Sequence, residues 1–376
     1  MIFREEFDNT IVISFMGDIC LGDHLLTLGS GLGSFLQDSK NRKQFVSEVS
    51  SLYDPSDMVV ANLECVLSEK GLLEDDITTQ VLRGRRDSVD VLKELRVSVV
   101  NLANNHSCQY GLNAFTETKT VLEQNSIIPI GLKAHDKDHQ DANKTKLQMV
   151  TIKGKTIGLV GYSMLPEQFY PGYEQYARIE QDARREVLKD VETFKEKVDV
   201  LVVSMHWGTE LDHVPDNKDV RFAHKLVDSG ADIIVGHHPH VIQGVEEYKG
   251  KLIIYSLGDF IFDLMWDRRC REGMIVTVKI MNDFSLQYDL TFVYLSGDYK
   301  LRICTQNEHN RLNKTIKVYS KVIGKKRRFM ATKRYFRNLG FQLKKLFFML
   351  RKFKEYNKKV QSFLIKEKII KKMIPW

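Results

Sequence analysis

Three histidines within four residues follow an apolar run in the second half of the chain. His237, His238 and His240 come directly after Ile233-Ile234-Val235. Four more apolar runs turn polar where they end, and the carboxylate, amide and imidazole side chains found there are Asp18, Asn62, Glu64, Asn104, Asn105, His106 and His206. Ligands of open α/β sheets sit outside the carboxyl ends of the strands, so we expect these polar side chains to converge on one site.

Carboxylate oxygens, amide oxygens and imidazole nitrogens together suit one or two divalent first-row metal ions. Two such ions need a bridging carboxylate, which Glu64 or Asp18 could supply. The histidine that closes Asn104-Asn105-His106 could protonate a leaving oxygen or polarise a phosphoryl group. These residues favour metallophosphoesterase chemistry, although the histidine triplet by itself would suit a structural loop equally well.

The five apolar runs have the length of buried strands and lie at 11–18, 58–64, 97–106, 200–206 and 233–240. Amphipathic segments separate them, and we expect helices over 87–95, 112–124, 179–197 and 220–229. Short strands that are apolar on both faces and alternate with helices indicate an α/β domain. Hairpins about 153–155 and 249–250, followed by a strand pair at 274–280 and 286–295, predict a mixed sheet or two packed sheets.

A chain of 376 residues with 43% hydrophobic content can bury a full core as one large domain or two ordinary ones. Its net charge of +7 is uneven, because 19 Lys and Arg against two acidic residues from Lys321 onward leave −10 for everything before. The five cysteines form no Cys-x-x-Cys pair, which favours a reducing compartment. We see neither a signal-peptide pattern nor an uncharged apolar run of ~18 to 20 residues, and expect a cytoplasmic protein.

Six blocks of the sequence resemble a known family and occur in that family's order over roughly residues 10 to 280. They are Gly17-Asp18-Ile-Cys-Leu-Gly22, Ala61-Asn-Leu-Glu64, Asn101-Leu-Ala-Asn-Asn-His106, His206-Trp-Gly-Thr-Glu210, Gly236-His-His-Pro-His-Val241 and Tyr255-Ser-Leu-Gly-Asp-Phe-Ile-Phe262. The blocks look like those of the bacterial capsule (poly-γ-glutamate) synthesis protein CapA family, which is held to belong to the calcineurin-like metallophosphoesterase superfamily. The resemblance implies a four-layer α/β/β/α sandwich with a metal site at its strand ends, and we expect this domain to span residues 1–310.

Carried over block by block, the resemblance assigns metal-ligand roles to Asp18, Glu64, Asn105, His206, His238 and His240, and a catalytic proton-transfer role to His106. It implies a divalent metal, and the sequence does not distinguish Mn, Fe, Zn or Mg. Spacing favours His238 and His240 over His237, because residues two apart on extended backbone point to one side. Asn104 and His237 are expected to bind substrate, and Arg83 lies in a loop that could reach an anionic substrate or be merely solvated.

Three positions depart from the family pattern. Cys20 stands where the superfamily carries the histidine of Asp-x-His, Gln109 stands where an aspartate usually precedes Tyr-Gly, and Asp259 replaces an asparagine. The thiolate of Cys20 could take the place of the missing imidazole, or Cys20 could be a small buried hydrophobe.

We therefore expect a metal-dependent phosphoesterase-like protein in capsule, exopolysaccharide or poly-γ-glutamate biosynthesis. Its partners would be an anionic polymer or phosphorylated substrate, and a polymer synthase. The alternative is a noncatalytic component that keeps the phosphoesterase fold and binds the polymer or the synthase. The missing imidazole supports that alternative.

The segment 321–376 is predicted to be a basic amphipathic helical tail, interrupted near Gly340. Its apolar residues could insert into an anionic membrane at the inner face, which we favour, and they are Phe341, Leu346, Phe347, Phe348, Leu350 and Phe353. The same residues could pack against the body of the protein instead. Nonspecific nucleic-acid binding by the tail is disfavoured.

Overall fold

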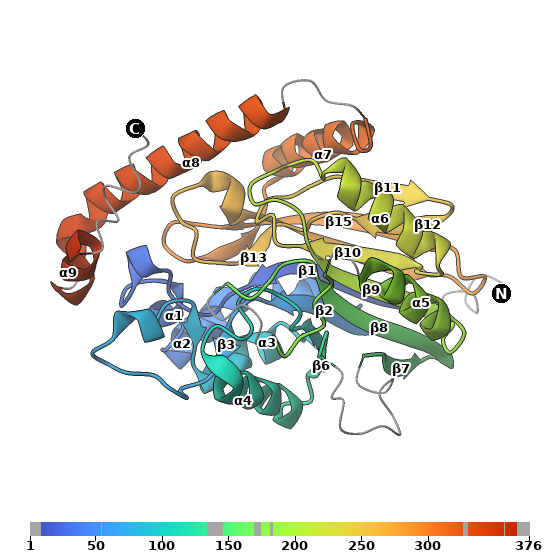
Figure 1. Ribbon diagram of the computed structural model, residues 1–376, viewed down its shortest axis with the longest axis horizontal. Coiled ribbons are helices and arrows are strands. Elements are labelled where there is room, and N and C mark those ends of the chain that lie inside the picture. The colour runs from blue at the N-terminus through green and yellow to red at the C-terminus, as the bar shows by residue number, and fades with distance from the viewer. Residues whose placement is uncertain are drawn as a thin grey trace.

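The computed structural model describes residues 9–53, 55–133, 146–168, 174–180, 183–325, 330–356 and 358–366. Two mixed sheets pack face to face within these ranges (Figure 1). The strands of the eight-stranded sheet are β1 (Ile11–Ile19), β2 (Met58–Leu63), β5 (Val99–Asn101), β6 (Ile128–Ile130), β13 (Asp259–Ile261), β14 (Glu272–Ile280), β15 (Leu286–Leu295) and β16 (Leu301–Ile303). Their order is β16-β15-β14-β1-β2-β5-β6, with β13 beside β1.

The second sheet has six strands, which are β7 (Gln148–Ile152), β8 (Lys155–Ser163), β9 (Val200–His206), β10 (Ile233–His237), β11 (Val245–Tyr248) and β12 (Lys251–Ile254). Their order is β11-β12-β10-β9-β8-β7, and β8, β9, β10 and β12 run parallel. A separate two-stranded pair joins β3 (Val66–Leu67) to β4 (Arg83–Gly84).

Helices cover the outer faces of both sheets. On the first sheet lie α2 (Ser39–Val46), α3 (Val89–Glu94) and α4 (Gly111–Gln124), with the short α1 (Leu32–Phe35) nearby, and on the second lie α5 (Arg184–Lys195) and α6 (Asn217–Asp228). Three helices follow the last strand, namely α7 (Gln306–Lys321), α8 (Met330–Lys352) and α9 (Lys358–Lys366). The expected four-layer α/β/β/α sandwich with a helical C-terminal segment is confirmed.

The alternation of side chains along the strands builds three apolar layers. In β1, Ile13 and Phe15 face the core between the sheets, whereas Met16 packs toward the helices. In β9, Val202 faces the same central core and Val203 packs under α5 and α6. Strands that are buried on both faces explain why these segments are continuous apolar runs in the sequence.

The predicted hairpins are confirmed, and their turns have the backbone that such hairpins require. Lys153 and Gly154 between β7 and β8 have φ of 47° and 79°, and Lys249 and Gly250 between β11 and β12 have φ of 52° and 75°. The predicted run 97–106 is different, because β5 ends at Asn101 and the chain continues as a loop. Its asparagines bond to neighbouring strand ends rather than extending the sheet.

Close backbone contacts join the carboxyl ends of the strands at the centre of the molecule. A Cβ atom on Gly17 would lie 1.9 Å from the carbonyl oxygen of Gly258, and one on Gly236 would lie 2.0 Å from that of Tyr255. Only glycine fits such approaches. These contacts hold β1 close to the start of β13, and β10 close to the end of β12.

The basic C-terminal segment lies along one side of the body (Figure 1). Its contacts are with loops that follow the strand ends, and they join Arg334 to Asp212 and Asp216, Arg337 to Asp212, Lys344 to Asp267, and Lys359 to Asp75. The ring of Trp266 also meets Phe341 and Phe348, at centroid distances of 5.8 and 5.9 Å.

Two expectations for this segment were wrong in detail. Helix α8 runs without interruption through Gly340, because tertiary packing of the next residue, Phe341, outweighs the roughly 1 kcal/mol cost of a helical glycine. The apolar residues also divide between two faces: Phe341 is buried, and Leu346, Phe348 and Phe353 pack against the core, whereas Phe347 and Leu350 are exposed. No helix among the described ranges combines the length and apolar character that crossing a bilayer requires.

Candidate metal centre

Buried carboxylates from adjacent strands form one side of the site. Asp18 lies near the end of β1, at an irregularity in its pairing with β2, and Glu64 follows β2. Both are inaccessible to solvent, and Asp259 of β13, paired in register with Asp18, is nearly so. Carboxylates gathered in so small a buried volume repel one another unless a positive charge lies among them.

Imidazoles from the second sheet face these carboxylates. His206 ends β9, and its Nε2 lies 3.6 Å from Glu64 Oε1. His240 follows β10, and its Nε2 lies 3.9 Å from the same oxygen while its Nδ1 bonds Asp259 Oδ1 at 2.8 Å. Glu64 Oε1 therefore lies between imidazoles that arrive from two different strand ends.

The loop after β10 positions its histidines through an unusual backbone. His238 and His240 have φ of 94° and 57°, values that non-glycine residues rarely adopt and that concentrate at functional sites. The sequence predicted that extended backbone would turn these two side chains to the same side. The backbone at His238 and His240 is not extended, so that predicted reason is wrong. The positive φ values bring their rings together, with centroids 5.9 Å apart.

These side chains fit a divalent cation. Two overlapping groups, Glu64 with His206 and His238, and Asp18 with Glu64 and His240, each place their ligand atoms within 4.8 Å of one another. Glu64 Oε1 and His238 Nδ1 are buried atoms without a hydrogen-bond partner in the described structure. Because an unpaired buried polar atom is costly, their convergence is the chemistry expected of a metal site.

A third group joins Glu210 to His238 and His240, and Glu210 is exposed. It extends the possible ligand set toward solvent. Glu210 stood in one of the family-like blocks, but nothing in its spacing alone marked it as a ligand.

The electrostatics of the site show how its charges balance. Burial would raise the pKa of Asp18, but the hydrogen bond and charge of His237 hold it below the usual value. Burial and the charge of Asp18 raise the pKa of Glu64 well above normal, despite the opposing charge of His240. Burial would lower the pKa of His240, yet the charges of Asp259 and Glu64 raise it. The cluster therefore attracts both protons and cations.

Asn62 connects the carboxylates to the loop after β5. Its Nδ2 donates to Asp18 Oδ1 at 2.9 Å, and its Oδ1 accepts from the amides of Asn101 and Asn104 at 3.3 and 3.2 Å. The sequence placed Asn62 among the converging polar side chains without a metal-ligand role, and the importance of Asn101 was missed. The available signal was that Asn101 is the first asparagine of the predicted run 97–106.

The predicted residues of the loop after β5 occupy distinct positions. Asn105 Oδ1 lies 2.7 Å from His206 Nε2, so two potential ligand atoms face each other. His106 is buried, its Nδ1 lies 2.9 Å from Gln109 Oε1, and burial lowers its pKa to about 4. The side chain of Asn104 bonds Asn62, the carbonyl of Leu63 and the backbone of His106, which places it within the supporting network.

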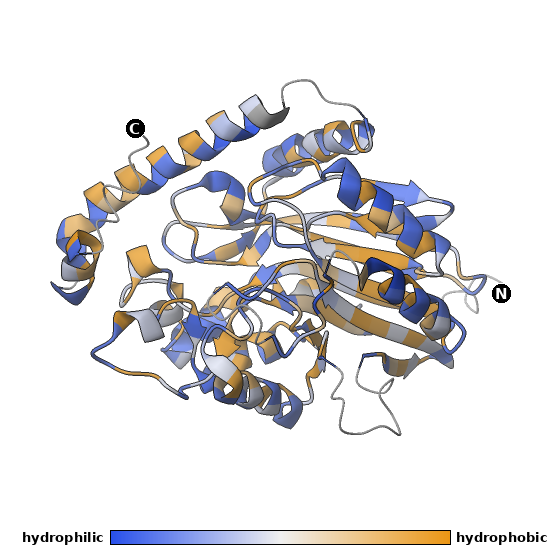
Figure 2. Ribbon diagram, in the orientation of Figure 1, coloured by the Kyte–Doolittle hydropathy of each residue, from blue (hydrophilic) through white to orange (hydrophobic). Residues whose placement is uncertain are grey.

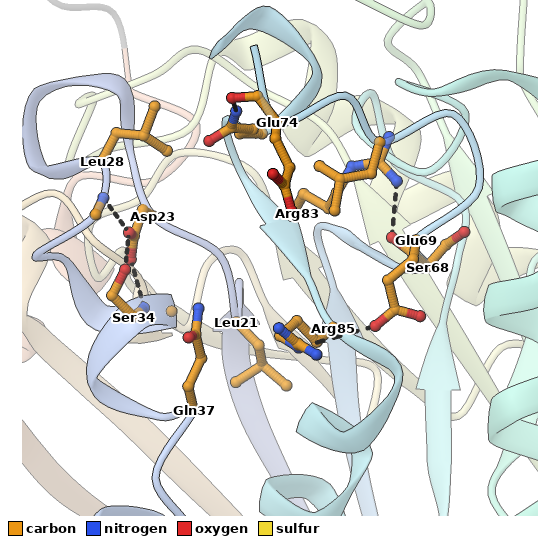
Figure 3. Close-up of a pocket in the computed structure, with 14 residues that line it drawn as sticks. Leu21, Asp23, Leu28, Ser34, Gln37, Ser68, Glu69, Glu74, Arg83 and Arg85 are labelled. Atoms are coloured by element: carbon orange, nitrogen blue, oxygen red, sulfur yellow. Dashed lines mark hydrogen bonds and ion pairs between the residues drawn. The ribbon is translucent and has the colours of Figure 1, made fainter. Parts of the chain in front are cut away.

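Two other predicted substrate residues are also placed by their contacts. His237 Nδ1 lies 3.0 Å from Asp18 Oδ1, and its ring is buried. The guanidinium of Arg83 donates to the carbonyls of Thr79, Ser68 and Lys70 and stacks on Tyr110, 3.8 Å from the ring centroid. Arg83 lines a cavity of about 250 Å³, and the described residues around this cavity include none of the predicted metal ligands. Figure 3 shows Arg83 among the residues that line it.

With this geometry in place, comparison with known proteins identifies the family. The family model described as bacterial capsule synthesis protein PGA_cap matches residues 12–264. The chain belongs to this family. The match spans all of the strand ends that carry the predicted ligands and ends before α7, α8 and α9.

Two named relatives of this chain match it over a stretch of similar length to the family match. The chain is 28% identical over 285 residues to the PGA biosynthesis protein CapA of Bacillus subtilis (strain 168), covering 76% of this chain and 71% of the relative. It is 29% identical over 281 residues to the capsule biosynthesis protein CapA of Bacillus anthracis, covering 72% of this chain and 64% of that protein. The chain thus spans less than two thirds of the second relative. Among solved structures, a 5'-nucleotidase precursor from Thermus thermophilus aligns with a TM-score of 0.46 at 15% identity, over 82% of this chain and 58% of that one.

The departures of this PGA_cap member can now be located. Cys20 is buried, its Sγ lies 4.0 Å from the carbonyl of Gly22, and burial beside Cys65 raises its thiol pKa well above normal. It joins none of the possible ligand groups among the described residues. Gln109 orients His106, and Asp259 bonds His240, so these two departures contribute contacts within the site.

Proposed function

We propose that this protein is a divalent-metal-dependent phosphoesterase that acts in the production of an anionic cell-surface polymer. The observation that carries the proposal is the pair of ligand groups that share Glu64. A shared carboxylate is the arrangement by which two ions can be held side by side. Asp18, Glu64, Asn105, His206, His238 and His240 would hold the metal, with Glu210 at the solvent side. When bound, a divalent metal supplies Lewis-acid stabilisation of phosphoryl oxygens and lowers the pKa of water.

The remaining residues of the site would bind and orient the substrate. His106 is kept neutral near pH 7 by its low pKa, and Gln109 fixes its ring through Nδ1. Because Gln109 Oε1 accepts the single N–H of the neutral ring, Nε2 offers a lone pair that would accept a proton as a general base, and His106 would donate to the departing oxygen only after gaining that proton. Asn62 and Asn104 would hold the carboxylates and the His106 backbone in place. Burial of the whole cluster strengthens each of these electrostatic contacts.

The polymer context comes from the family and from the names of its members. Relatives are described as PGA and capsule biosynthesis proteins, which supports a substrate that is a phosphorylated precursor or an anionic polymer-linked phosphoester. A polymer synthase in the same pathway is the expected protein partner.

The test is hydrolysis by the purified chain with added Mn²⁺, using bis-p-nitrophenyl phosphate and p-nitrophenyl phosphate. We expect His238→Ala combined with His240→Ala to lower turnover by at least about a hundredfold and to reduce bound metal. His224→Ala is the matched control, because His224 lies on α6 and pairs with Glu246 away from the site. Equal turnover in the wild type and the double variant would refute the proposal.

A second function is favoured by one observation, the buried Cys20 where a ligand imidazole is expected. It is a noncatalytic component that binds polymer or synthase through the same fold. Metal analysis of the purified protein separates the two. Two tightly held ions per chain favour hydrolysis, whereas a metal-free chain that binds poly-γ-glutamate equally well with and without His238→Ala and His240→Ala would favour the binding role.

A further inference from the structure

Helix α8 has two apolar faces, and only one of them packs on the body. Phe341 and Met349 on the inner face are buried. On the outer face Phe336, Leu343, Phe347 and Leu350 are 63%, 40%, 68% and 53% exposed. Their spacing of 7, 4 and 3 residues places them in a single stripe along the helix. We call these four residues the outer stripe; the bands of high and low hydropathy along α8 are visible in Figure 2.

Basic residues border the outer stripe. Lys333, Lys344 and Arg351 are exposed and, at 100° per residue, fall along one flank between the outer stripe and the body. Helix α8 contains no acidic residue, and the first one after Lys321 is Glu355. A continuous apolar stripe with a cationic border is the surface that an in-plane membrane helix presents.

The ion pairs of α8 separate its cations into two sets. Arg334 and Arg337 point to the body, where Asp212 and Asp216 neutralise them, and the flanking Lys344 pairs with Asp267. Lys333 and Arg351 have no ion pair within the described part of the chain, and their charge is available to a partner. The acidic residues that pair with Arg334 and Arg337 anchor this face of α8 to the body. The outer stripe therefore faces away from the body, which carries most of the acidic residues.

We propose that the outer stripe docks the protein on an anionic lipid surface. The bordering cations would draw α8 to anionic headgroups, and the four apolar side chains would enter the headgroup and acyl boundary. A nucleic acid would use the charge but leave the outer stripe in water. Because the inner face of α8 contacts loops that follow β9 and β13, docking holds the strand-end site close to the membrane. This inference goes beyond the proposed function and does not depend on hydrolysis.

The test measures sedimentation of the full chain with vesicles. We expect binding to vesicles of equimolar phosphatidylcholine and phosphatidylglycerol, and little binding to phosphatidylcholine alone. The variant Phe336→Ser, Phe347→Ser and Leu350→Ser should partition at least about tenfold more weakly. The matched control is Leu73→Ser, Leu112→Ser and Met149→Ser, which changes three side chains, each 57% exposed, elsewhere on the surface and should bind like the wild type.

A second pair of variants tests the cationic border. Lys333→Gln with Arg351→Gln should weaken binding severalfold at low salt, and added NaCl should weaken the wild type in the same direction. The far-ultraviolet circular dichroism and thermal midpoint of every variant are compared with the wild type. Should the triple variant not fold, Phe347→Ser alone serves in its place.

Four outcomes would overturn the proposal. They are equal binding to both vesicle types, equal vesicle binding by the wild type and a folded outer-stripe variant, retention by DNA without retention by vesicles, and dimerisation that the outer-stripe variant abolishes in place of vesicle binding. Phosphoesterase activity without vesicle binding would leave the proposed function standing and refute docking alone.

Discussion

Glu308 ties the start of α7 to the last strand of the first sheet. Its two oxygens bond the guanidinium of Arg302 at 2.8 and 3.0 Å, and it completes a capping box with Thr305. Arg302 first, and the backbone N–H of Thr305, lower the pKa of Glu308 to about 2 from 4.5, although burial opposes them. A carboxyl with a lowered folded-state pKa stabilises the fold above the unfolded pKa and loses that contribution as the pH falls.

We therefore predict that Glu308→Gln lowers the free energy of unfolding by about 1–2 kcal/mol at pH 7. The difference from the wild type should shrink as the pH falls from 4.5 toward 2. Urea unfolding across this range measures it. The control is Glu123→Gln, which removes an exposed helical pair with Lys119 and should change stability by less than about 0.5 kcal/mol. A difference that persists unchanged at pH 2 would contradict the assignment.

Individual site residues were predictable where their position relative to a strand was informative. Asp18, Glu64 and His206 stand at strand ends, and the structure brings them together. The roles of Asn62 and Gln109 were not predictable, because the sequence marked Asn62 only as one of several converging polar side chains and Gln109 only as the replacement of an aspartate. Their actual partners come from loops and strands elsewhere in the fold, and no pattern in the sequence encodes that contact.

At the scale of the elements, the attachment of helix α8 to the body depends on acidic residues in loops that lie far from α8 in the sequence. Arg334 and Arg337 converge on Asp212, whose side chain is only 10% exposed. Removing both arginines leaves that carboxylate without its cations in a mostly buried position, which is costly. We predict that Arg334→Ala with Arg337→Ala loosens α8 by about 2–3 kcal/mol.

Hydrogen exchange measures this effect, because amides of α8 should lose protection while those of β9 keep it. Lys333→Ala is the matched control, since it removes an exposed cation of the same helix and should leave exchange unchanged. Equal protection in the double arginine variant and the wild type would show that the other contacts of α8, such as Lys344 with Asp267 and the rings around Trp266, hold the helix without the two arginines.

The sequence predicted the elements better than their faces. Apolar periodicity located the main strands and helices, and glycine-containing turns located the hairpins. It assigned Phe341, Phe347, Phe348 and Leu350 to one face, and the structure divides them. The pattern alone could not separate two apolar faces on one helix, because that division depends on where Trp266 packs.

In the whole molecule, the proposed ligands come from both sheets. Asp18 and Glu64 belong to the first sheet, and His206, His238 and His240 to the second. An ion bound between them would cross-link the two halves of the sandwich and stabilise the folded state by mass action, by about 2.7 kcal/mol at a hundred times its dissociation constant. We predict that a chelator lowers the thermal midpoint by about 3–4 °C.

Calorimetry with and without EDTA, followed by Mn²⁺ addition, provides the measurement. The variant with His238→Ala and His240→Ala should show no shift with the chelator. A midpoint that stays constant in the wild type would mean that no ion joins the sheets.

The composition of the chain predicted a positively charged C-terminal segment and a negatively charged body. It did not indicate which acidic loops would contact helix α8.

The position of α8 has a consequence for biosynthesis. The loops that carry Asp75, Asp212 and Trp266 are synthesised well before the helices that contact them, and N-terminal regions generally fold first during translation. On the ribosome, the strand-end site therefore assembles while its neighbouring surface is still bare. The last helices then attach to a finished scaffold, so the nascent protein forms the proposed metal site before the surface proposed to reach the bilayer.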